Sequence, residues 1–73
     1  MLELIEKLVK EKADLYVKLV ALRSFIPSEK FSQVHPVQQV LLQKQLEAMT
    51  DYHRILLERI EHLEEQLRDF SKT

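Results

Sequence analysis

Residues 42–70, LQKQLEAMTDYHRILLERIEHLEEQLRDF, decide the fold of this chain. Read in alternating steps of four and three residues, the stretch has an apolar side chain at every step except His53. These positions are Leu42, Leu46, Met49, His53, Leu56, Ile60, Leu63, Leu67 and Phe70. Residues at this spacing share one face of an α-helix, and no Gly or Pro interrupts them. The pattern predicts a long amphipathic helix that buries this apolar seam.

A second row of residues flanks the seam and widens the face that should be buried. Its members are Leu41, Gln45, Ala48, Tyr52 and Ile55. One partner helix covers a narrow seam, whereas a face this wide needs more than one partner. The helix is therefore expected to pack against the first part of the chain and against copies of the chain.

The first third of the chain repeats the pattern and predicts an earlier helix over about residues 1–25. Its seam consists of Ile5, Leu8, Lys12, Leu15, Leu19, Leu22 and Ile26, and Lys12 is the polar member. A flanking row again widens the apolar face, with Leu2, Val9, Ala13, Tyr16 and Val20.

The segment between the two helices carries stop and start signals. Pro27 ends the first helix, because the residue before a proline is driven out of the α region. Ser28 is expected to cap a single turn at 28–32, and Phe31 to pack back onto the helices. Pro36 suits the first position of the next helix, where its missing N–H is not needed. The predicted fold is all-α: a single domain, 1–73, forming an antiparallel hairpin with a helix at about 1–25, a turn at 26–35 and a helix at about 36–69.

Size and composition restrict the classes of protein that fit. A chain of 73 residues without cysteine has a small core and no disulfides, so self-association is the expected source of stability. Eleven basic and twelve acidic residues give a net charge of −1, which argues against DNA binding. No apolar run is long enough to cross a bilayer, so no membrane partner is expected. Three histidines without cysteine argue against a structural zinc site, and no metal or cofactor is expected.

No catalytic constellation stands out in the sequence, so the chain is not expected to be an enzyme. Asp51 and His53 are two residues apart, and such residues point away from each other on a helix. His53 is best read as a core or interface histidine, with a proton switch as the alternative. His35 reads as a helix-start residue, and His62, which lies among glutamates, as a solvated one.

Three residues are candidates for ligand contacts. Tyr16, at the edge of the first apolar face, is either a boundary aromatic or a platform on which a base stacks. Lys30 and Ser32 lie in the turn, where a cation and backbone N–H groups can hold phosphate, although lysines in loops are usually only solvated. The residues alone leave two classes open: a ligand-binding oligomer, and a structural or adaptor coiled coil that binds another helical protein.

A set of short motifs resembles a known family. They are LRSFI at 22–26, SEKF at 28–31, QVLLQKQLEAM at 39–49, Tyr52, and RI at 59–60. In this order and spacing they resemble the bacteriophage anti-CBASS cyclic-nucleotide sponges, over about residues 11–67. The resemblance implies an all-helical homo-oligomer, a hexamer in studied members. Such proteins capture cyclic oligonucleotide second messengers in the cytoplasm of the infected bacterial host without cleaving them, which blocks activation of CBASS effectors.

The resemblance also implies binding residues. An aromatic residue of the first helix stacks on a base of a cyclic dinucleotide, and a lysine near the turn meets the phosphates; here these are Tyr16 and Lys30. A second type of site, for cyclic trinucleotides, uses a hydroxyl residue and an arginine. Ser32 matches the hydroxyl residue, and either Arg59 or Arg68 is the arginine.

Overall fold

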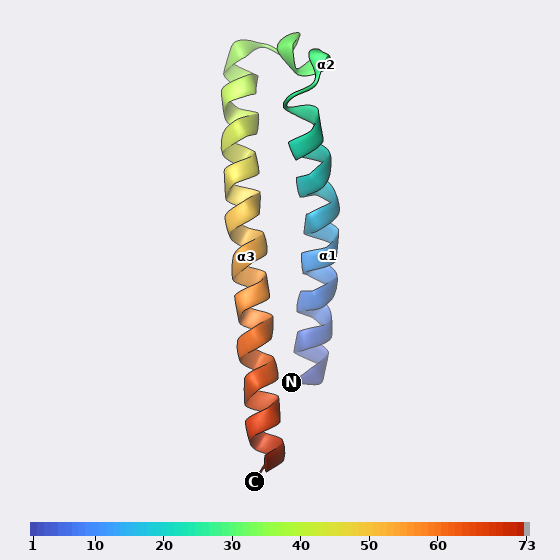
Figure 1. The fold of residues 1–73 in the computed structure, drawn as a ribbon, viewed down its shortest axis with the longest axis vertical. Helices are drawn as coiled ribbons and strands as arrows, with labels where there is room; N and C mark the ends of the chain where they lie inside the picture. The colour runs from blue at the N-terminus through green and yellow to red at the C-terminus, as the bar shows by residue number, and fades with distance from the viewer. Residues whose placement is uncertain (73) are drawn as a thin grey trace.

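The computed structural model describes residues 1–72 and the side chains of residues 1–70. It contains three helices in chain order: α1 (Leu2–Phe25), α2 (Glu29–Ser32) and α3 (Pro36–Lys72). α1 and α3 run side by side in opposite directions, and α2 lies at the end of the hairpin where they are joined (Figure 1). This arrangement confirms the all-α hairpin that the two periodic stretches predict.

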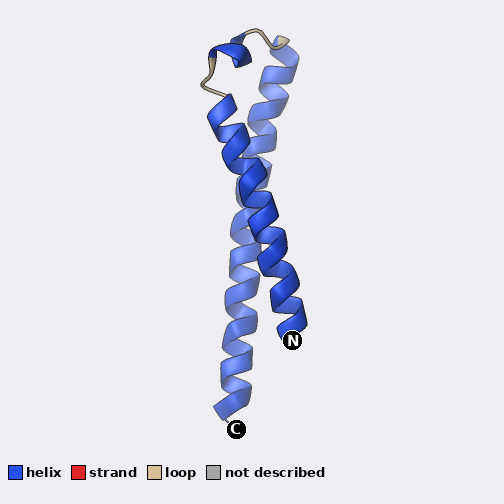
Figure 2. Ribbon diagram, turned by 90° about the vertical axis from the view of Figure 1, so that its right-hand side faces the viewer, coloured by secondary structure: helices blue, strands red, loops and turns tan. Residues whose placement is uncertain are grey.

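The core is built from the two predicted seams. Leu8, Leu56 and Ile60 form its buried centre, and the partly buried Ile5, Leu15 and Leu63 pack against them. Leu56 has no exposed surface. The helices cross at a shallow angle (Figure 2) and pack against each other, as expected when side chains spaced by three and four residues interdigitate.

The turn has the predicted caps. Ser28 accepts a hydrogen bond from the Phe31 backbone N–H at 3.4 Å, which satisfies a donor at the start of α2. Phe31 is buried and packs edge-on against Phe25, with ring centroids 5.8 Å apart. His35 Nδ1 accepts from the Val37 N–H at 3.1 Å, so His35 does mark the start of α3.

α3 is longer than α1 and continues to Lys72, past its expected end near residue 69. At 1.5 Å per residue the helices are about 36 Å and about 55 Å long. The C-terminal end of α3 consequently extends beyond the start of α1 (Figure 1). Phe70, the last predicted seam residue, lies on this overhang and is 77% exposed.

The hairpin buries its seams and leaves both flanking rows at the surface. On α1 the row Leu2, Val9, Ala13, Tyr16 and Val20, here called the Tyr16 flank, is exposed. On α3 the row Leu41, Gln45, Ala48, Tyr52 and Ile55, here called the Tyr52 flank, is exposed as well.

The two flanks lie on opposite sides of the hairpin. Glu11 of α1 reaches across to Tyr52, which places Glu11 on the side of the Tyr52 flank. Tyr16 follows Glu11 by five residues, and at 3.6 residues per turn it points roughly 140° away around α1. One hairpin therefore exposes an apolar row from α1 on one side and an apolar row from α3 on the other. Within residues 1–72, no helix is long and apolar enough to span a membrane.

Candidate functional site

Tyr16 lies on its flank with 51% of its surface exposed. Its ring centroid is 5.5 Å from that of His53 on α3, and the ring planes are inclined by 40°. α3 therefore supports one side of the tyrosine ring while much of the ring stays open to solvent. An aromatic ring presented in this way can stack on a nucleotide base.

His53 is half-buried among the apolar residues of the α3 seam. Its Nε2 atom is buried and has no hydrogen-bond partner among the described residues. Within the hairpin the ring is therefore only partly buried, at the boundary of the apolar core.

Lys30 and Ser32 belong to α2, at the closed end of the hairpin, and both are exposed. The Ser32 hydroxyl donates to the Glu29 carbonyl oxygen at 2.5 Å. Tyr16 lies nine residues before the end of α1, about 13 Å along the helix axis. One chain therefore does not bring Tyr16 and Lys30 into a single pocket.

The two candidate arginines lie far from the turn. Arg59 follows Pro36 by 23 residues, about 35 Å along α3, and is exposed. Arg68, also exposed, lies further along the same helix, near the overhang. Neither arginine is near Ser32 within one chain, so a site that combines them would have to draw on more than one subunit.

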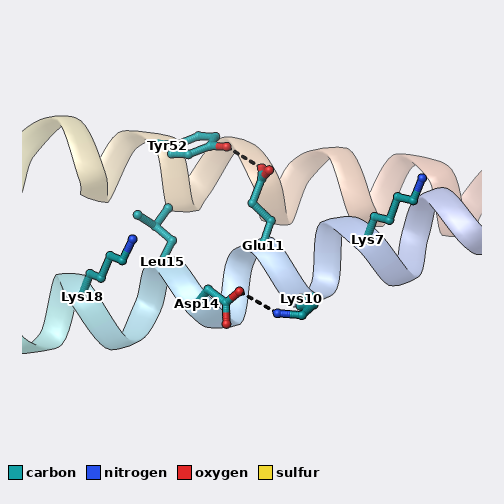
Figure 3. Close-up of a pocket in the computed structure, with 7 residues that line it drawn as sticks. All are labelled: Lys7, Lys10, Glu11, Asp14, Leu15, Lys18 and Tyr52. Atoms are coloured by element: carbon teal, nitrogen blue, oxygen red, sulfur yellow. Dashed lines mark hydrogen bonds and ion pairs between the residues drawn. The ribbon is translucent and has the colours of Figure 1, made fainter.

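The structure also contains a groove that the sequence did not predict. It lies between α1 and the Tyr52 flank, has a volume of about 380 Å³, and is lined by Lys7, Lys10, Glu11, Asp14, Leu15, Lys18 and Tyr52 (Figure 3). Its charges are partly paired: Lys10 contacts Asp14 at 3.0 Å, and the Tyr52 hydroxyl donates to Glu11. Lys7 and Lys18 stand at its two ends (Figure 3).

The environment of Tyr52 raises its pKa above the ordinary value of 10.0. The hydrogen bond to Glu11 is the largest cause, followed by desolvation and by the negative charge of Glu11. The positive charge of Arg59 acts in the opposite direction. A carboxylate that accepts a hydrogen bond from the phenol hydroxyl favours the protonated phenol, so Tyr52 stays neutral and links the two helices.

A second hollow, of about 370 Å³, lies on α3 alone, between Leu46, Glu47, Thr50 and Asp51. Its charged residues are acidic, so it does not suit an anionic ligand. Among the described residues, no group of three His, Asp or Glu side chains is placed to hold a metal ion.

The model of the Sequestin family matches residues 2–62. The chain belongs to the Sequestin family. The match takes in α1, α2 and most of α3, and it confirms the resemblance to a sequestering family that the sequence motifs suggest. Of the candidate residues, Tyr16, Lys30, Ser32 and Arg59 lie within the matched range, and Arg68 lies beyond it. Comparisons with curated proteins and with solved structures gave no significant match.

Proposed function

We propose that this Sequestin-family protein binds and sequesters cyclic oligonucleotide second messengers without cleaving them. In the infected bacterial cell, this sequestration would block the activation of CBASS effectors and so protect the phage. The observation that carries the proposal is the half-exposed ring of Tyr16 on an apolar flank, in a chain whose family name denotes sequestration. The family name also favours binding over catalysis.

Tyr16 and Lys30 have the chemistry that a cyclic dinucleotide requires. The ligand carries two flat bases and two phosphates. Stacking of a base on an aromatic ring contributes roughly 1–3 kcal/mol, and a charge-assisted hydrogen bond from a lysine roughly 1.5–3 kcal/mol. Two copies of each contact sum to roughly 5–12 kcal/mol before the costs of ordering, so nanomolar affinity, about −12 kcal/mol, would need further contacts from the assembled subunits.

Tyr16 lies about 13 Å before the end of α1 and Lys30 lies on α2, so we expect this site to be shared between subunits. Assembly is also what the exposed flanks favour, because each leaves an apolar row uncovered. Since the flanks lie on opposite sides, a copy docked on one leaves the other available. Two separate interfaces on one chain give a ring where the rotation between subunits closes, and a ring is what the hexamer implied by the resemblance requires.

Cyclic trinucleotides would occupy a different site. Ser32 supplies a hydroxyl, and Arg59 or Arg68 supplies a guanidinium that can form bidentate hydrogen bonds to a phosphate. Because these residues are far apart within one chain, this site too would form where subunits meet.

The test combines recovery of the ligand with a panel of variants. Wild type incubated with a cyclic dinucleotide and then heated should release it intact; a linear product would overturn the proposal. Tyr16→Ala and Lys30→Ala should each weaken dinucleotide binding at least about tenfold. Ser32→Ala and Arg59→Ala or Arg68→Ala should weaken only trinucleotide binding. Lys44→Ala, which removes a charge from the exposed face of α3, is the matched control and should bind normally.

A coiled-coil adaptor that binds another helical protein is the alternative function, and the exposed apolar rows favour it. A thermal melt separates the two functions. Ligand at about one hundred times its dissociation constant adds about 2.7 kcal/mol to the free energy of unfolding. If no cyclic di- or trinucleotide raises the melting temperature, the adaptor function is favoured.

A further inference from the structure

His53 is the one polar residue in the α3 seam from Leu42 to Phe70, and its buried ring nitrogen, Nε2, forms no hydrogen bond with the described residues of the hairpin. A buried polar atom without a hydrogen bond destabilises the folded state, so an apolar side chain would be more stable at this position. A hydrogen bond within the hairpin therefore does not explain this residue.

The contact that His53 does make is with Tyr16. The two rings lie 5.5 Å apart between centroids at 40°, within the range in which aromatic rings attract each other. Tyr16 is half exposed at the edge of α1, where an unsupported ring would be free to change rotamer. The flat imidazole on α3 limits that freedom from the inner side and leaves the outer side open.

We propose that His53 is a positioning residue for Tyr16: its ring holds the tyrosine in the orientation in which the exposed face receives a ligand base. The inference rests on the proposed function for the identity of the ligand, but the positioning itself belongs to the free protein. A tyrosine held in the binding orientation loses less conformational entropy when the ligand binds, so the contact with His53 should increase the affinity for the ligand.

Two substitutions separate positioning from stability. His53→Leu completes the apolar seam and removes the unpartnered nitrogen, so the variant should melt at a higher temperature than wild type. It also removes the ring beside Tyr16 and should bind a cyclic dinucleotide about tenfold more weakly. His53→Phe removes the same nitrogen but keeps a flat ring, and should bind like wild type. If His53 had only a structural role, His53→Leu would not combine higher stability with weaker ligand binding. His53→Phe would also not restore wild-type binding.

A measurement on the free protein makes the test independent of the ligand. The NMR signals of the Tyr16 ring protons report the neighbouring ring through its ring current. They should move in His53→Leu and stay closer to wild type in His53→Phe, while His62→Gln, on the exposed face of α3, should leave them unchanged.

The outcomes distinguish failure of the inference from failure of the proposed function. If wild type binds no cyclic nucleotide, the proposed function fails, and the Tyr16 signals alone decide whether His53 positions the ring. If these signals are the same in His53→Leu and wild type, positioning is overturned. The inference is also overturned if wild type binds and His53→Leu binds equally well, or if His53→Phe loses binding as His53→Leu does.

Discussion

At the scale of single residues, the contact between Tyr52 and Glu11 joins the two helices and makes stability depend on pH. The folded state raises the pKa of Tyr52, so folded protein holds the phenol proton more tightly than unfolded protein does. The contribution to stability is complete below the unfolded pKa of 10.0 and is lost as pH rises through the higher folded pKa. Wild type should thus have a higher urea midpoint than Tyr52→Phe at pH 8, and the difference should shrink above pH 10. Tyr16→Phe is the matched control and should have the wild-type urea midpoint at pH 8. A Tyr52→Phe midpoint equal to that of wild type at pH 8 would contradict the prediction.

At the scale of the helices, the seam decides whether α1 and α3 stay together. Leu56 is fully buried between them, so Leu56→Asp places an unpaired charge in an apolar core, at a cost of several kcal/mol. In a chain with so small a core this loss should abolish the cooperative thermal transition measured by circular dichroism. Val17→Asp adds the same charge on the outer face of α1, at a residue that is 69% exposed, and should melt near the wild-type temperature. A Leu56→Asp variant with the wild-type transition would mean that the seam is not the core.

At the scale of the whole molecule, the two flanks are proposed to form two different interfaces. Val9→Asp on the Tyr16 flank and Ile55→Asp on the Tyr52 flank alter exposed residues, so each hairpin should remain helical. Each substitution should nevertheless reduce the mass measured by light scattering to an intermediate assembly, and the double variant should be monomeric. Val17→Asp, which lies on neither flank, should keep the wild-type mass. If both single variants also keep that mass, the flanks are not interfaces.

Much of the fold could be predicted because its signals are local. The seams around Leu8 and Leu56 follow from a period of 3.6 residues, and α3 starts at Pro36, where the proline ring suits the first helical position. α1 does end close to Pro27, but Ile26 keeps right-handed helical backbone angles (φ −55°, ψ −44°), so the predicted reason for that end is wrong. The cap by Ser28 depends on residues three positions apart. Such features need only neighbouring residues, so two helices, the face that each buries, and the turn between them could all be predicted from local patterns.

The pairing of residues across the helices depends on how the helices pack in three dimensions. Tyr16 meets His53, and Glu11 meets Tyr52, because one seam packs into the other at a single lengthwise register. A repeat of three and four residues fits equally well after a shift of one heptad, so periodicity does not select that register. The length and packing of the turn, with Phe31 against Phe25, fix where α3 starts relative to the end of α1. For that physical reason the sequence pointed to Tyr16 as a stacking residue, whereas its support by His53 and the groove beside Tyr52 appeared only once the helices were packed.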